Sequence, residues 1–190
     1  MILSLRIQNN PMSQNNSISW NANNSLSWSD FQAESNSASF EDAHSVIKYH
    51  YTWTLNFDRI DDKIMFFVEC LKLTSEFYPL LSWVRKSQAT SSLLKHEQGH
   101  FDLAELLRPN ITEQTQSIFN KKKFPTRGQN YEQQKQFAHE DSGLMIAKQV
   151  EKWEKYFFEK EIEYDKLTNY GQIFEKQQEY DALFQNLHKM

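Results

Sequence analysis

The 190-residue chain has little of several residue types, and each scarcity excludes a class of protein. Its one cysteine, Cys70, rules out an internal disulfide, and the apolar run around it predicts a buried thiol. With only four glycines and four prolines, the chain is neither collagen-like nor of low complexity, and long helices are favoured. No apolar run is long enough to span a membrane. The net charge is −4, so no nucleic-acid partner is expected.

The first residues carry no recognisable export signal, because residues 1–7 are too short for a signal peptide and no cleavage motif follows. As written, the chain is expected to be cytoplasmic, whereas a misassigned N-terminus would leave a periplasmic or secreted location open. We expect a flexible N-terminal segment over 1–17 and a single domain over 18–190. Aromatic clusters from Ile18 onward favour docking of the Asn/Ser-rich stretch on that domain. The oligomeric state stays open.

Hydrophobic periodicity predicts a hairpin followed by helices. Residues 45–57 alternate between apolar odd and polar even positions, which is typical of a strand with one buried face. A turn at 58–62 and a second strand over 63–73 would complete an antiparallel hairpin. From about residue 87 the period becomes helical, with Ser87 or Thr90 as N-cap. Pro109 should end or kink this helix, and further helices are expected over 131–163 and 172–187, with a break at 164–171.

Residues 96–100 read His-Glu-Gln-Gly-His, which is the HExxH pattern of zinc peptidases. Residues four apart on a helix differ by about 40° in direction and about 6 Å in height, so two imidazoles can bind one ion. Glu97 points about 100° from His96, beside the metal. There it can take a proton from a zinc-bound water and pass it to a leaving amine. The motif therefore predicts a Zn²⁺ cofactor, Glu97 as general base, and a peptide or protein substrate.

A helical wheel places this motif on the apolar side of its helix. With His96 at zero, the residues within about 80° are His100, Leu93, Leu103, Ala104 and Leu107. The other side holds Lys95, Gln98, Asp102 and Glu105. A carboxylate on the apolar stripe is costly unless it is paired, and a metal would offset that cost. The alternative is an accidental motif in a helical interaction protein, with hydrogen-bonded core histidines and Glu97 salt-bridged at the surface.

A zinc site requires a third protein ligand. Glu105 is excluded because it points about 180° away from His96 on the same helix, and Glu113 lies about 25 Å further along it. The third ligand must therefore come from later in the chain. The candidates are His139, Glu140, Glu151, Glu154, Asp165 and Tyr170.

Three stretches of the chain resemble the domain-of-unknown-function 922 family of bacterial predicted zinc-dependent peptidases. They are LSWSDF at 26–31, LLKHEQGHFD at 93–102 preceded by SWV at 82–84, and YDKLTNYG at 164–171. The resemblance implies an α+β, zincin-like fold, with a small antiparallel sheet packed on the HExxH helix and further long helices. It also implies metallopeptidase activity. Where the family pattern has a His before the last glycine, this chain has Tyr170, so Tyr170 or Asp165 is expected as third ligand or transition-state stabiliser.

Taken together, the residues and the resemblance predict a zinc metallopeptidase. The alternative is a catalytically inactive zincin-like module that binds metal or peptide, which Tyr170 motivates. Three ligand atoms around one point, with room for a fourth, would favour the enzyme. Imidazoles of His96 and His100 that point apart, or that are separately hydrogen-bonded in the core, would favour the accidental motif.

Overall fold

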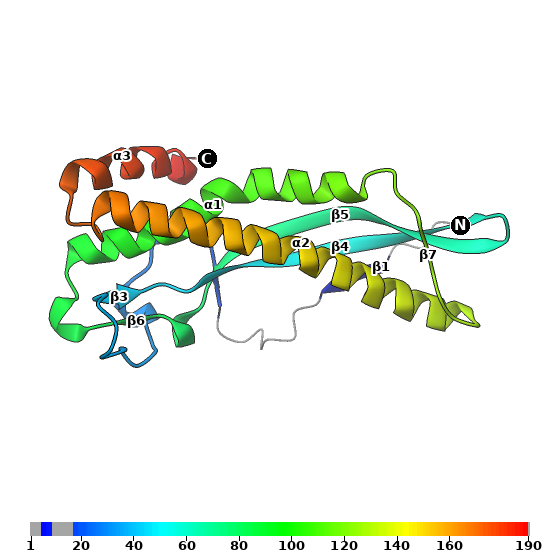
Figure 1. Cartoon of the computed structure of the whole chain (residues 1–190), viewed down its shortest axis with the longest axis horizontal. Coiled ribbons are helices and arrows are strands. Elements are labelled where there is room, and N and C mark those ends of the chain that lie inside the picture. The colour runs from blue at the N-terminus through cyan, green and yellow to red at the C-terminus, as the bar shows by residue number, and fades with distance from the viewer. Residues whose placement is uncertain (1–4, 9–16, 190) are drawn as a thin grey trace. The chain divides into compact units, whose positions relative to one another are not determined.

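The computed structural model describes residues 5–8 and 17–189, which form an α+β fold of helices and a small antiparallel sheet (Figure 1). The strands are β1 (Leu5–Gln8), β2 (Ile18–Ser19), β3 (Ala43–His44), β4 (Ile47–Ile60), β5 (Lys63–Phe77), β6 (Trp83–Val84) and β7 (Phe124–Pro125). The α-helices are α1 (Ser91–Phe119), α2 (Tyr131–Thr168) and α3 (Phe174–Phe184). Single 3₁₀ turns occupy Trp28–Asp30, Pro79–Leu81, Lys86–Gln88 and Leu187–Lys189.

The main sheet has the strand order β1-β4-β5-β2, and β7 pairs with β5 as well. A second, two-stranded sheet joins β3 antiparallel to β6. β4 and β5 form the predicted hairpin, and both turn residues, Asp61 and Asp62, have positive φ angles of 47° and 61°. Positive φ at both central residues is typical of the type I′ turn, whose twist matches that of a hairpin.

The prediction that Cys70 is buried is wrong, since this thiol is exposed. The buried positions of β5 change phase partway along the strand: Phe66 and Val68 are buried, and then Leu71 and Leu73. Two consecutive outward positions, Glu69 and Cys70, separate the two series. An apolar run does not reveal such a change of phase, so it gave no sign that Cys70 faces outward.

Helices α1 and α2 begin near the predicted residues and extend further than expected, whereas α3 spans Phe174–Phe184 and is shorter than the predicted 172–187. Thr90 Oγ1 accepts a hydrogen bond from the Leu93 N–H at 3.2 Å, which confirms Thr90 as the N-cap of α1. Pro109 does not end α1, which continues to Phe119. The prediction that the helix breaks at 164 is wrong, because α2 continues to Thr168. It is followed by three residues with positive φ: Asn169, Tyr170 and Gly171. This extra length matters because it puts Asp165 on a helix.

The chain divides into two compact units, each built from separate segments. The described residues of unit 1 are 5–8, 51–73 and 109–153, with Trp53, Leu55 and Phe66 in its core. Unit 2 comprises 17–50, 74–108 and 154–189, with Tyr49, Phe77 and Tyr164 in its core. β4, β5, α1 and α2 each contribute to both units, so one domain over 18–190 stays a prediction.

The segment expected to be flexible, residues 1–17, is described only at 5–8 and at Ser17. Residues 5–8 form β1, which pairs antiparallel with residues 52–55 of β4. The rest of that segment lies outside the described residues. Among the described helices, none combines the length and the apolar character that a membrane crossing needs.

Candidate metal centre

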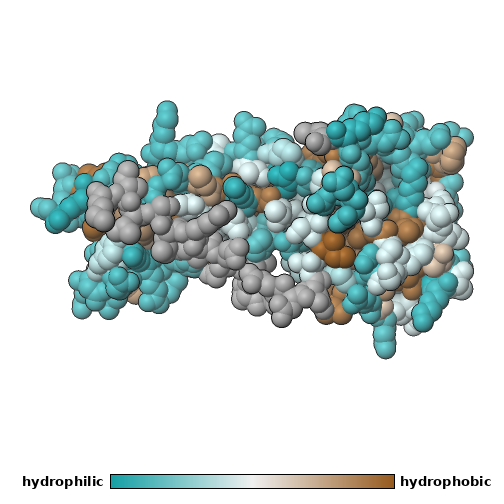
Figure 2. All heavy atoms as spheres, turned by 180° about the vertical axis from the view of Figure 1, so that it is seen from behind, coloured by the Kyte–Doolittle hydropathy of each residue, from teal (hydrophilic) through white to brown (hydrophobic). Residues whose placement is uncertain are grey.

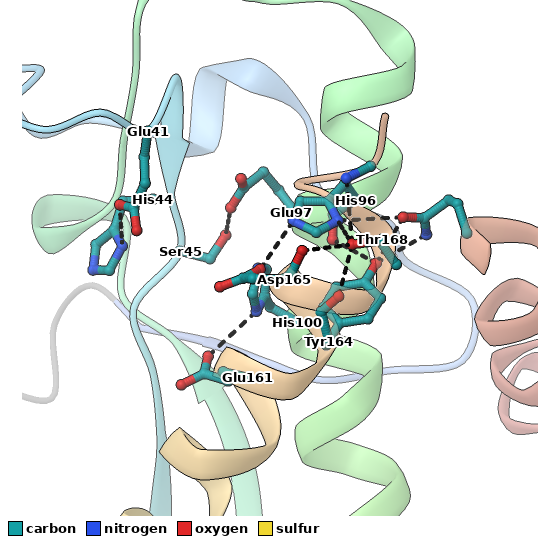
Figure 3. A network of polar contacts seen from close by, with 12 residues as sticks. Glu41, His44, Ser45, His96, Glu97, His100, Glu161, Tyr164, Asp165 and Thr168 are labelled. Atoms are coloured by element: carbon teal, nitrogen blue, oxygen red, sulfur yellow. Dashed lines mark hydrogen bonds and ion pairs between the residues drawn. The ribbon is translucent and has the colours of Figure 1, made fainter. Parts of the chain in front are cut away.

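The HExxH residues lie within unit 2, in the N-terminal part of α1, and both imidazoles point at one carboxylate of α2 (Figure 3). His96 Nε2 is 3.2 Å from Asp165 Oδ1, and His100 Nε2 is 3.1 Å from the same oxygen. The three atoms lie within 4.8 Å of one another. His96 is 1% exposed, so this convergence takes place in the interior. An accidental motif would predict rings that point apart, and these two rings do not.

A chain of hydrogen bonds fixes the orientation of the His96 ring. Lys95 Nζ is 2.6 Å from Asp181 Oδ2, and Asp181 Oδ1 accepts a hydrogen bond from Gln177 Nε2 at 3.0 Å. A carboxylate only accepts, so the Gln177 amide turns its oxygen toward His96 Nδ1, which lies 3.2 Å away. His96 must then carry a proton on Nδ1. If the ring is neutral, its Nε2 lone pair faces Asp165, which is the state that a metal ligand requires.

The second imidazole, that of His100, lies between two carboxylates. Its Nδ1 is buried and lies 3.5 Å from Glu161 Oε1, at the outer limit of a hydrogen bond. Glu161 and Asp165 are four residues apart on α2, so they share one face of that helix. A carboxylate behind a ligating histidine is the usual outer contact of a metal site.

The charged groups of this cluster shift one another's pKa. Burial lowers the pKa of His100, but Asp165, Glu161 and Glu97 outweigh it and hold that pKa well above the usual value for histidine. Burial raises the pKa of Asp165, but the two imidazoles lower it well below its usual range. The pKa of Glu161 is raised, because burial outweighs the nearby His100. The site therefore concentrates negative charge where a cation can bind.

Glu97 is held beside this cluster by the loop between β3 and β4. Its side chain is buried, and Ser45 Oγ donates a hydrogen bond of 2.6 Å to Glu97 Oε2 (Figure 3). Both residues line a cavity of about 300 Å³, together with the two histidines and Asp165. The proposed base and the three candidate ligands thus open onto one space.

Two glycines permit the close packing around His96. A Cβ at Gly99 would lie 2.1 Å from the Tyr164 hydroxyl, which donates to the His96 carbonyl oxygen at 3.2 Å. A Cβ at Gly171 would lie 2.8 Å from His96 Cβ, and Gly171 also has a φ of +79°. The Tyr164 ring stacks on the His96 imidazole at 4.7 Å between centroids. The backbone of α1 and the end of α2 can approach this closely only where a side chain is missing.

The residues present fit a zinc ion. Four ligands at about 2.0–2.2 Å around one zinc lie about 3.3–3.6 Å apart. The distances of 3.1 and 3.2 Å from Asp165 Oδ1 to the two Nε2 atoms are only slightly shorter. Two histidines and one carboxylate are also a recognised ligand set for catalytic zinc.

Of the other sequence candidates for the third ligand, Tyr170 alone is at this cavity. Tyr170 lines the same cavity, with its ring 6.5 Å from that of His96 between centroids. The remaining candidates do not line this cavity: His139, Glu140, Glu151 and Glu154. Three residues of the site were not predicted from the sequence: Glu161, Ser45 and Gln177. The four-residue spacing of Glu161 and Asp165 was a usable signal, whereas nothing in the sequence marks Ser45 or Gln177.

The side of α1 that the helical wheel sets opposite the apolar stripe is partly buried as well. Asp102 and Glu105 are both buried. Asp102 accepts hydrogen bonds from Trp20 Nε1 and Gln98 Nε2, each at 2.8 Å. Glu105 is paired with Arg108 at 2.7 Å. The helical wheel shows which residues share a face, but it does not show that this polar face has buried partners of its own.

Comparison of the chain with protein-family models, with curated proteins and with solved structures found no match. The resemblance to the domain-of-unknown-function 922 family therefore stays a prediction. What the site can do must be argued from its own geometry.

Proposed function

We propose that the chain is a zinc-dependent metallopeptidase of zincin-like fold that hydrolyses peptide bonds. One observation carries the proposal: the Nε2 atoms of His96 and His100 converge on one Asp165 oxygen. A neutral His96 protonated on Nδ1 has a lone pair facing that carboxylate, which is unfavourable unless a cation lies between them. His96, His100 and Asp165 would then hold the zinc, and Glu161 and Gln177 would orient the rings.

A bound zinc would polarise the scissile carbonyl and lower the pKa of water, which makes hydrolysis feasible at neutral pH. Glu97 accepts the proton of the attacking water and passes it to the departing amine. Ser45 keeps the Glu97 carboxylate turned toward the cavity through its 2.6 Å hydrogen bond. Tyr170, at the cavity wall, is placed to donate a hydrogen bond to the oxygen on which charge develops.

The substitution Glu97→Gln tests this mechanism. It removes the base and keeps the size of the side chain, so kcat should fall by at least about 1,000-fold while zinc binding is unchanged. Glu163→Gln is the matched control, because Glu163 is exposed on α2 and forms an ion pair with Lys160. Peptide cleavage by Glu97→Gln at the wild-type rate would contradict the assignment.

The second candidate is a catalytically inactive zincin-like module that binds metal or peptide. It is favoured by the two contacts of Asp165, which form an ion-pair network that protons on both histidines can complete. This candidate predicts zinc or peptide binding without hydrolysis. Wild-type protein that binds one zinc and cleaves nothing in a diverse peptide library would support it over the peptidase.

A further inference from the structure

Phenylalanine is exposed only around the candidate site. The chain has fourteen phenylalanines, and the structure describes all of them. Three are exposed: Phe40 at 75%, Phe158 at 60% and Phe174 at 66%. Phe40 and Phe158 line the cavity of about 300 Å³ that holds the candidate metal centre, called the metal cavity below. Phe174 lines a neighbouring hollow, which Phe40 also lines. Figure 2 shows on one face how hydrophobic side chains at the surface are gathered within hydrophilic surroundings. Exposed aromatic side chains that gather in one place mark a binding surface.

The neighbouring hollow continues the metal cavity past Glu97. It has a volume of about 470 Å³ and shares Phe40, Glu97 and Tyr170 with the cavity. The rings of Phe40 and Tyr170 meet edge to face, with 5.5 Å between their centroids. These two rings therefore stand at the boundary between the hollows, beside the proposed base. A ligand that follows both hollows passes Glu97 on its way.

Each hollow has its own apolar wall. In the metal cavity it consists of Phe158 and Ile162, which are four residues apart on α2. In the neighbouring hollow it consists of Leu93 and Phe174, at the starts of α1 and α3. Two acidic residues of the neighbouring hollow have partners: Glu41 lies 3.2 Å from His44, and Asp42 lies 3.1 Å from Arg85. Apolar contact, rather than charge, is what these walls offer a ligand.

We propose that the site takes an extended peptide segment with a bulky apolar side chain on each side of the bond beside Glu97. One apolar side chain contacts Phe158 and Ile162, and the other contacts Leu93 and Phe174. Phe40 and Tyr170 contact the segment between them. The inference rests on the proposed function and adds the substrate class, which is the interior of apolar peptide sequences rather than chain ends.

Cleavage-site profiling of the zinc-loaded protein on a diverse peptide library tests this inference. Bulky apolar residues should be enriched on both sides of the cleaved bond. Phe158→Ala and Phe174→Ala should each lower kcat/KM about tenfold for such peptides and relax the preference on one side only. The control is Leu144→Ala, since Leu144 is 71% exposed and lines neither hollow. Cleavage without apolar enrichment would overturn the inference and leave the peptidase assignment intact.

Binding gives an independent readout if cleavage itself fails. Zinc-loaded Glu97→Gln protein should bind a fluorescent peptide with two central phenylalanines at least about tenfold tighter than the same peptide with alanines. Phe40→Ala added to this protein should remove most of that difference, and Leu144→Ala should not. Equal binding of the two peptides would overturn the inference. Selective binding without any cleavage by wild type would support it and contradict the peptidase assignment.

Discussion

Helix α1 carries two histidine–carboxylate clusters on opposite faces, and they differ in how their carboxylates are satisfied. The structural cluster is Asp102 with Trp20, Gln98 and His188. The candidate metal centre is Asp165 with His96 and His100. His188 places Nε2 3.1 Å from Asp102 Oδ2 and Nδ1 2.9 Å from the Ala22 carbonyl oxygen. Each carboxylate oxygen of Asp102 therefore has its own donors, and one protonated imidazole completes the cluster.

In the candidate metal centre, two imidazoles compete for the same oxygen of Asp165. Protons can satisfy this arrangement too, but an Nε2 proton makes His96 a buried cation, because its Nδ1 already donates to Gln177. One divalent ion would instead supply its charge at a single point and use the lone pairs of both rings. Buried histidine and carboxylate are thus insufficient to mark a metal site. The convergence of two rings on one atom distinguishes the candidate centre from the structural cluster.

The largest difference between the two clusters is expected in zinc affinity, when the negative charge of the central aspartate is removed. Asp165→Asn replaces the anionic ligand by an amide, so zinc affinity should fall by at least about 100-fold, beyond the loss typical of outer contacts. Competition with a chromophoric chelator measures this affinity. Asp102→Asn is the matched control and should change it less than about threefold. Equal losses in the two variants would contradict the distinction.

For the stability of the fold, the larger loss is expected from Asp102→Asn and the smaller one from Asp165→Asn. Asp102→Asn turns an NH₂ group toward buried donors, so the free energy of unfolding should fall by about 2 kcal/mol. Asp165→Asn should cost the metal-free protein less, because an amide offers both a donor and an acceptor to the two imidazoles. Urea titration of both variants without metal gives the comparison. If Asp165→Asn is the more destabilising change, the candidate centre is primarily an ion-pair network.

A smaller effect is expected from the residue that orients His96. Gln177→Leu removes the acceptor for His96 Nδ1 and keeps the buried volume, so zinc affinity should fall about tenfold. The control is Gln178→Leu, because Gln178 is exposed on the same helix. The same chelator competition applies, and unchanged affinity in Gln177→Leu would show that Gln177 does not fix the ring.

The smallest effect concerns pH and the structural cluster. Burial lowers the pKa of His188, but the Ala22 carbonyl and Asp102 together raise it above its usual value. A raised pKa in the folded state stabilises the protein below the unfolded pKa of about 6.5, and this contribution is lost as pH rises through the folded pKa. His188→Gln should therefore lower the melting temperature more at pH 5.5 than at pH 8.5. The difference should correspond to less than about 1 kcal/mol, and a loss that is equal at both pH values would contradict the charged contact.

The sequence predicted what depends on neighbours along the chain. The hairpin, the N-cap Thr90 and the shared face of His96 and His100 all follow from local spacing. Asp165 was only one of six candidates, because its contact with His96 joins residues 69 positions apart. The expected break at 164 also hid its four-residue spacing from Glu161. The burial of Asp102 could not be predicted for a similar reason, since its partner Trp20 is 82 positions away.

The zinc content of the purified protein tests the central claim most directly, namely that His96, His100 and Asp165 hold one divalent ion. Elemental analysis after dialysis against dilute zinc should find about one zinc per chain in wild type. It should find none in the double variant His96→Ala/His100→Ala. The matched control, His44→Ala/His50→Ala, removes two histidines outside the three-atom group and should keep its zinc. No zinc in wild type, or equal zinc in wild type and His96→Ala/His100→Ala, would contradict the claim.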